Sequence, residues 1–165
     1  MRGMKACFLA ALCACAILPA LPVYSAGSNT LSMAATVIGT CKVTTPPGIL
    51  DFGTIDPSGA GNVPASTTFA IKCTKSTVSS AATDDGGLNF SGTKRMKHSV
   101  TPTAFLPYKV TYSGDAGFVG QGFVAAALAQ SVTVNGTITP AQFQNALVTT
   151  AGQIYGDTVT ITVNP

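Results

Sequence analysis

Turn-forming residues constrain the fold of this chain more than any other feature of its sequence. Beyond residue 40, proline or glycine interrupts the chain roughly every 8–20 residues, in turn sequences such as TPPG, DPSGAGN, DDGG, SGDAG and NGT. The segments between these turns are short and rich in threonine and valine, which favour strands. The sequence therefore predicts an all-β fold of short antiparallel strands.

Several of these segments alternate apolar and polar side chains, as a strand with one buried face requires. The clearest is residues 156–163, in which Val159, Ile161 and Val163 alternate with threonines. Three further clear segments and two weaker ones follow the pattern: 68–74, 106–112 and 131–136, and then 49–53 and 87–92. Their side chains expected to face inward are Leu50, Phe52, Phe69, Ile71, Cys73, Leu88, Phe90, Leu106, Tyr108, Val110, Tyr112, Val132 and Val134. About seven strands predict one antiparallel sandwich of immunoglobulin-like kind.

Two segments have helical character. Residues 140–147, PAQFQNAL, predict a single helical turn behind a proline. Residues 123–130, FVAAALAQ, contain helix-forming alanines but stand where a hairpin is expected, so the structure of residues 116–130 stays open. The basic stretch KRMKH, residues 94–98, is more typical of a solvated loop or strand end than of a binding patch.

Residues 1–26 predict a secretory signal peptide. Arg2 and Lys5 precede an apolar run, and cleavage after Ser25 or after Ala26 fits equally well. A lipoprotein signal with lipidation at Cys15 is the alternative. No later run reaches the ~18 apolar residues that a membrane helix needs. We therefore expect the rest of the chain to be exported through the periplasm to the cell surface or the extracellular space.

The exported part carries little charge. After residue 26, seven lysines and arginines stand against six aspartates and no glutamate, which gives a net charge near +1. This balance does not favour binding to nucleic acid or to anionic membranes. We therefore expect no nucleic acid among the partners of the protein.

Two of the five cysteines, Cys41 and Cys73, lie outside the predicted signal peptide. A single pair in an exported protein most simply forms one disulfide in an oxidising compartment. The alternatives, metal ligation or a nucleophilic thiol, lack helping groups, since the chain has one histidine and no CxxC motif. Both cysteines fall on inward faces, so the disulfide is expected to join the first strand of the sandwich to the next major one.

The sequence offers little of the chemistry that an enzyme needs. His98 is the only histidine that could act as a base, and it lies in a basic, polar stretch. Most of the aspartates stand beside glycine or proline, where they are ordinary turn residues. Asp84 and Asp85 precede two glycines but lack the ligand spacing of a calcium loop. We therefore predict no catalytic residue, no metal site, no cofactor and no small-molecule substrate.

One further alternating segment stands between the predicted signal peptide and the first exported cysteine. In NTLSMAATVIGTCKV, residues 29–43, four alternate residues share one face of a strand: Leu31, Met33, Ala35 and Val37. Alternation alone fits two interpretations equally well. The segment either pairs within its own domain or is donated as a strand to another molecule.

Six segments of the chain occur in an order that resembles a known family. They are TCKVTTPPGILDFGTIDP, IKCTK, KRM, LPYKVTYS, GTITPAQ and the closing GDTVTITV. As an ordered set they resemble the spore coat protein U domain family, which includes major subunits of archaic chaperone–usher pili. The resemblance covers roughly residues 29–163, although residues 117–130 are more apolar than the family pattern.

This resemblance implies an incomplete immunoglobulin-like sandwich that is completed by donor-strand exchange. A periplasmic pilus chaperone first fills the groove of the missing strand, and the N-terminal extension of the next subunit replaces it at an outer-membrane usher. On this chain, residues 27–39 would be the extension with its hinge and residues 40–165 the pilin domain. The implied donor residues are Leu31, Met33, Ala35 and Val37, the hinge is Gly39, and the groove wall carries Val159, Ile161 and Val163.

The implied function is a structural subunit of a surface pilus, acting in adhesion or biofilm formation, whose partners are copies of itself or related pilins. A head-to-tail contact that does not close builds a filament. Burial of each of the three larger donor side chains contributes on the order of 1.5–3 kcal/mol. The alternatives are a secreted, self-complete spore or cell coat protein, a tip adhesin, which would normally carry a further receptor-binding domain, and an exported enzyme.

Overall fold

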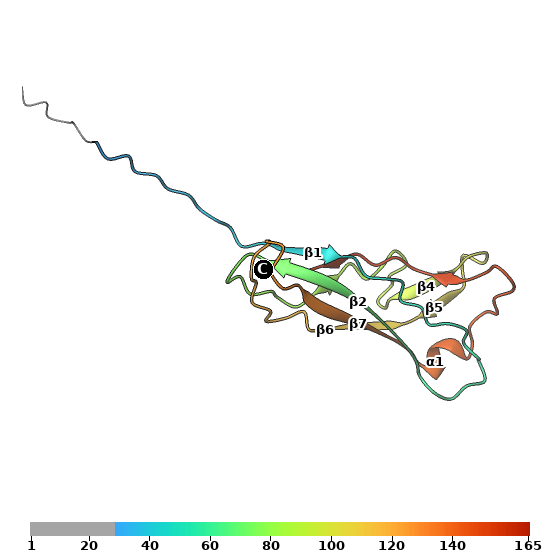
Figure 1. The fold of residues 1–165 in the computed structure, drawn as a ribbon. Coiled ribbons are helices and arrows are strands. Elements are labelled where there is room, and N and C mark those ends of the chain that lie inside the picture. The colour runs from blue at the N-terminus through green and yellow to red at the C-terminus, as the bar shows by residue number, and fades with distance from the viewer. Residues whose placement is uncertain (1–28) are drawn as a thin grey trace, which may run out of the picture. The chain divides into compact units, whose positions relative to one another are not determined.

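The computed structural model describes residues 29–165 (Figure 1). The predicted signal peptide, residues 1–26, and the first two residues of the predicted extension lie outside the described residues. Residues Thr36–Pro165 form one compact unit, to which the described residues before Thr36 do not belong. In the described part of the chain, helix is confined to one turn and every paired strand is antiparallel, which confirms the predicted all-β fold.

The largest sheet has four strands in the order β1–β2–β7–β6. Their bounds are β1 Cys41–Thr45, β2 Val63–Cys73, β7 Gln130–Ile138 and β6 Lys109–Ser113. The two central strands, β2 and β7, pair without interruption along residues 63–71 of β2. The inward residues of these two strands are the most deeply buried apolar residues of the first core cluster: Phe69, Ile71, Val132 and Val134.

Two smaller sheets form the second layer. One pairs β3 (Thr83–Asp84) with β9 (Ile161–Thr162). The other has the order β5–β4–β8, with bounds Phe105–Pro107, Arg95–His98 and Tyr155–Gly156. Side chains from both layers form two core clusters, one around Phe69 and one around Phe143. This is the predicted immunoglobulin-like sandwich, although its strands are shorter and more numerous than expected.

The predicted strand at residues 106–112 contributes to both layers. It divides at Tyr108 into β5, which pairs with β4, and β6, which pairs with β7. Its four predicted inward residues are buried or half-buried, whereas Lys109 and Thr111 are exposed. The alternation is therefore confirmed, and the division shows how one segment can join two sheets.

The last predicted strand, residues 156–163, is divided as well. β8 ends at its start, β9 occupies two residues near its end, and residues 157–160 between them are not in a regular strand. Hydrogen bonds nevertheless continue along it, from Leu88 N–H to Thr158 O and from Asp85 N–H to Thr160 O. Its valines and isoleucine are half-buried and its threonines exposed, as the alternation predicts.

The two weaker strand predictions have different outcomes. The prediction of a strand at 87–92 is wrong, because these residues form turns in which Leu88 is 79% and Phe90 54% exposed. Gly87 and Gly92 have φ angles of 90° and 71°, a conformation that interrupts a strand. Residues 49–53 also form no strand, but Leu50 and Phe52 pack against the core as predicted.

The basic stretch at residues 94–98 differs from the solvated loop or strand end that its charges predict. It forms β4, the central strand of its sheet, in which Met96 packs against the core and His98 is 2% exposed. The cationic groups have local partners, since Arg95 stacks on the ring of Phe105 at 4.0 Å. The guanidinium of Arg95 can therefore stay on a half-buried strand, because it packs on an aromatic ring.

The predicted helical turn behind the proline is confirmed. It forms α1, Pro140–Phe143, and Thr139 caps it by donating its N–H to Oε1 of Gln142 at 2.7 Å. Residues 123–130, left open by the sequence, form bends and turns up to the start of β7. In the part of the chain that the structure describes, no helix has the length and apolarity to cross a membrane.

The two exported cysteines form the predicted disulfide. Cys41 stands directly opposite Cys73 in the pairing of β1 with β2, and the bond spans a sequence separation of 32. It therefore fixes the first strand of the sandwich to the central strand beside it.

We expect replacement of both cysteines by serine to lower the free energy of unfolding by about 3–4 kcal/mol, since a loop of this length gains that much unfolded-state entropy when it is released. Chemical unfolding of the exported protein and of the Cys41→Ser, Cys73→Ser double variant measures the difference. A reductant should destabilise the parent protein to the level of the variant and leave the variant unchanged. Equal unfolding midpoints without reductant would contradict a stabilising role for the bond.

Candidate functional site

An apolar cleft of about 310 Å³ opens into the core of the sandwich. Its two walls are residues 47–52 and residues 157–161, and its floor comes from strands of both layers. The side chains that matter most for its chemistry are Leu50, Phe52, Met96, Tyr108, Val110, Tyr112, Val134, Val159 and Ile161. Because most of these side chains are apolar, the cleft suits a series of apolar groups better than a charged ligand.

The first wall, residues 47–52, is held by side-chain packing and not by strand pairing. Pro46 and Pro47 follow the end of β1, and Pro47 is the first residue of the wall. The N–H groups of residues 48–50 have no main-chain partner among residues 29–165. Leu50 and Phe52 pack instead against Gly136 of β7, where an ideal Cβ would lie 2.8 Å and 2.7 Å from their side chains. Glycine at this position therefore lets the wall approach the sheet while its edge stays unpaired.

The second wall, residues 157–161, is part of the last segment of the chain, residues 157–163. The neighbouring segment, residues 85–88, donates main-chain hydrogen bonds to the carbonyl oxygens of Thr158 and Thr160, which are both even-numbered. Successive residues of a strand direct their main-chain groups to opposite edges. The odd-numbered residues therefore direct theirs toward the cleft side, where they have no main-chain partner among residues 29–165. Three of these odd-numbered residues are the predicted groove residues. Val159 and Ile161 line the cleft, and Val163 packs in the first core cluster.

β1 extends the opening along the core face of the large sheet. Val43 is paired with Ile71, so both side chains lie on the same face. Ile71 is fully buried, whereas Val43 is 43% exposed. The core face is therefore uncovered over β1, next to the first wall, as it would be if one strand of the sandwich were missing.

Two tyrosines of the cleft floor join the two layers. Tyr108 donates a hydrogen bond to Oδ2 of Asp157 at 2.8 Å, and Tyr112 donates one to Oδ2 of Asp84 at 2.6 Å. Burial, together with these anionic partners, raises the pKa of both tyrosines above its usual value. The hydroxyls therefore stay protonated and bonded, and they connect the floor of the cleft to Asp157 and Asp84.

Asp84 is the centre of a small polar network under the cleft. Its Oδ1 lies 2.8 Å from Nζ of Lys94. Burial raises the pKa of Asp84, but the hydrogen bonds from Lys94 and Tyr112 outweigh burial, and the pKa lies below its usual value. Oδ1 of Asp85 accepts two main-chain N–H groups. These contacts join strands and turns, and no group of three potential metal ligands occurs within residues 29–165.

The predicted donor residues all have exposed side chains. Leu31 is 81%, Met33 87% and Val37 81% exposed, and Ala35 is also exposed. Residues 29–40 form no strand in the structure. An apolar series left in water is typical of an interaction segment. Strand donation by these residues stays a prediction.

His98 has a structural position. Its Nδ1 accepts the N–H groups of Val100 at 3.2 Å and Thr101 at 3.0 Å, and its ring packs edge-on against Tyr155. The side chain is 2% exposed and lies outside the cleft lining. It therefore fixes the turn that follows β4.

Sequence reasoning missed the parts of the cleft that depend on residues far apart in the chain. The two tyrosine–aspartate bonds join residues separated by 49 and 28 positions. The available signal was that an inward tyrosine needs a partner for its hydroxyl. Gly136 was also missed, although a glycine inside a strand pattern often marks the close approach of another segment.

The family model described as the Spore Coat Protein U domain matches residues 28–162. The match therefore includes the exposed N-terminal segment, both walls of the cleft and all strands up to β9. A comparison with curated proteins gave no match.

We expect Tyr112→Phe to lower the free energy of unfolding by about 1–2 kcal/mol at pH 7, since it removes a hydrogen bond to a charged acceptor. The pKa of Asp84 is lowered in the folded protein, so this contribution is present above pH about 4 and is lost as the pH falls through that pKa. Thermal unfolding at several pH values measures it. The control is Tyr155→Phe, which removes a bond to the neutral carbonyl of Leu147, so its effect should not change over this pH range. Equal pH dependence of the two variants would contradict the assignment.

Proposed function

Because the chain belongs to the Spore Coat Protein U domain family, we propose that it is a structural subunit of a chaperone–usher pilus on the cell surface. This domain is known in subunits of such pili and is a structural pilus or coat domain, not an enzymatic one. In our proposal the subunits join head to tail, and residues 29–38 of each subunit enter the cleft of the next. The pilus would serve adhesion or biofilm formation.

The observation that carries this proposal is that both walls of an apolar cleft have unpaired main-chain groups. Among residues 29–165, the N–H groups of residues 48–50 have no main-chain partner on one side, and the main-chain groups of residues 159, 161 and 163 have none on the other. An added strand could bond to these edges while its alternate side chains enter the cleft. A compact small molecule could not satisfy two extended edges in this way.

The predicted donor strand has the dimensions that the cleft requires. Leu31 to Val37 spans as many residues as the last segment from 157 to 163, which contains the second wall, and at roughly 3.3 Å per residue each covers about 20 Å. Burial of Leu31, Met33 and Val37, all exposed here, would contribute on the order of 1.5–3 kcal/mol each. Ala35 contributes less, because its side chain is a single methyl group.

The open cleft also explains why such a subunit would need a chaperone and an usher before assembly. Unpaired strand edges beside apolar side chains promote aggregation if they are left in water. In the proposed pathway, a periplasmic chaperone covers the cleft after export, and an outer-membrane usher exchanges it for the donor strand of the next subunit. The predicted signal peptide is consistent with this route to the cell surface.

A self-complete coat protein is the alternative from another functional class. Such a protein would pair residues 29–38 within its own sandwich. The uncovered core face at Val43 and the main-chain groups of both walls that have no partner among residues 29–165 support an incomplete domain instead. For this reason we favour the pilus subunit.

We expect the exported protein to form a ladder on an unheated denaturing gel, which boiling converts to monomer. Deletion of residues 29–38 should abolish the ladder and leave a secreted monomer. A ladder that survives the deletion, or a folded monomer in both samples, would favour the coat protein.

We expect Met33→Asp to abolish the ladder, because an unpaired carboxylate would have to be buried in the cleft. Ser32→Asp is the matched control, since its side chain points to the opposite face of the donor strand and the ladder should persist. The same gel compares the two variants. Equal ladders, or loss of both, would contradict insertion with this face inward.

A further inference from the structure

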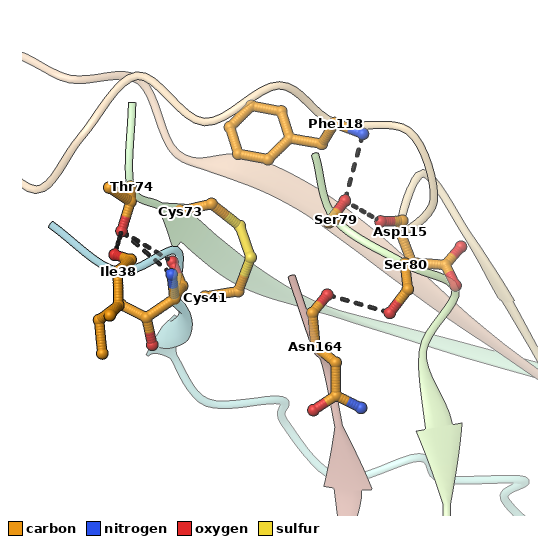
Figure 2. The surroundings of a disulfide bond; sticks show 10 residues. Ile38, Cys41, Cys73, Thr74, Ser79, Ser80, Asp115, Phe118 and Asn164 are labelled. Carbon is orange, nitrogen blue, oxygen red and sulfur yellow. Dashed lines mark hydrogen bonds between the residues drawn. A yellow bond between two sulfur atoms is a disulfide. The ribbon is translucent and has the colours of Figure 1, made fainter. Parts of the chain in front are cut away.

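The end of the predicted donor segment bonds to Thr74, the residue that follows the disulfide cysteine Cys73 (Figure 2). Its Oγ1 accepts the N–H of Thr40 at 3.1 Å. The same hydroxyl lies 3.4 Å from the carbonyl oxygen of Ile38 and 3.3 Å from that of Thr40, and the N–H of Thr74 donates to the latter at 2.9 Å. Thr74 therefore bonds to the main chain on both sides of Gly39. We call residues 38–40 the root.

Gly39 is enclosed on the same side. An ideal Cβ at this position would lie 3.1 Å from Oγ1 of Thr77 and 3.8 Å from Cβ of Pro165. Gly39 does not have the positive φ that a tight reversing turn would use. Close approach to Thr77, not a turn, is what glycine provides here, and the root continues directly into β1.

The second wall of the cleft ends beside the root. The N–H and the hydroxyl of Ser80 both donate to the carbonyl oxygen of Asn164, at 2.9 Å and 3.0 Å (Figure 2). The short segment from Thr74 to Ser80 thus holds the root at one end and the end of the wall at the other. A chain that reversed direction at the root would run along the wall of its own cleft.

Self-insertion would compete strongly with donation to a second subunit. A strand tethered to its own cleft acts at an effective concentration in the millimolar range, well above the concentration of free subunits in a cell compartment. A subunit that had filled its own cleft could neither accept nor donate a strand. Head-to-tail growth therefore requires that reversal at the root be unfavourable.

We propose that Thr74 is a positioning residue for strand donation: its bonds on both sides of Gly39 hold the root extended and direct residues 29–38 to a second copy of this chain. Reversal at the root would require a turn at Gly39 and the loss of the Thr74 bonds. This inference rests on the proposed function, because it concerns which cleft the donor strand enters.

The test compares three variants of the full chain with the parent protein. Thr74→Ala removes the hydroxyl, and Thr74→Ser restores it. Thr44→Ala is the matched control, because Thr44 donates a similar bond to the carbonyl of Ala70 on the same pair of strands but away from the root. Unheated gels measure the ratio of monomer to polymer, and proteinase K digestion followed by mass spectrometry measures protection of residues 29–38 in the monomer.

We expect Thr74→Ala to raise the monomer-to-polymer ratio roughly five- to tenfold, as the loss of one or two hydrogen bonds allows. The additional monomer should protect residues 29–38 from the protease, because they fill its own cleft. Thr74→Ser and Thr44→Ala should keep the parental ratio. A purely structural role for Thr74 would lower the melting temperature without producing the protected segment.

Two results would overturn the inference: equal ratios for Thr74→Ala and Thr44→Ala, or additional monomer whose residues 29–38 remain accessible to the protease. If Thr74→Ala does not accumulate, insertion of two glycines after Gly39 lengthens the root and should produce the same protected monomer; an unchanged ratio for this insertion overturns the inference as well. Failure of the proposed function is distinct, because the parent protein itself would then form no ladder that depends on residues 29–38.

Discussion

The pairing of β2 with β7 is the interaction on which the rest of the domain depends. These two strands form the longest ladder, and their inward side chains are almost completely inaccessible. β1 and β6 pair with their outer edges, and the disulfide fixes β1 to the end of β2. The last segment of the chain packs Ile161 and Val163 against the same core cluster. The two layers therefore meet on a rigid central pair, and the cleft is what this arrangement leaves uncovered.

A sandwich with an open core needs other contacts between its layers. The hydrogen bonds from Tyr108 to Asp157 and from Tyr112 to Asp84 provide them at the floor of the cleft. The close approach of Leu50 and Phe52 to Gly136 provides a third contact, which holds a wall that has no strand partner. These contacts explain how the domain can keep a defined cleft although part of its core is uncovered.

The accuracy of the sequence predictions followed the range of the interactions involved. Alternation within a segment correctly identified the inward faces at 68–74, 106–112, 131–136 and 156–163, because a period of two is a local property. It was wrong at 87–92, where two glycines with positive φ form turns. It was also wrong about solvation at 94–98, where Arg95 and Lys94 find partners on other segments. The disulfide was predicted correctly because two cysteines permit one intramolecular pairing.

The sequence by itself determined the fold class, the inward faces of the strands, the disulfide and the alternating apolar segment that precedes the first strand. Each of these depends on neighbouring residues or on a count. Only the tertiary structure decided that both walls of the cleft keep unpaired edges and that Leu50 and Phe52 of the first wall pack against Gly136. It also decided that Thr74 forms hydrogen bonds with the root, residues 38–40. The physical reason is that an unpaired strand edge, like the set of hydrogen bonds around Gly39, depends on which distant segments approach each other. The periodicity of side chains within one segment carries no information about which segments do so.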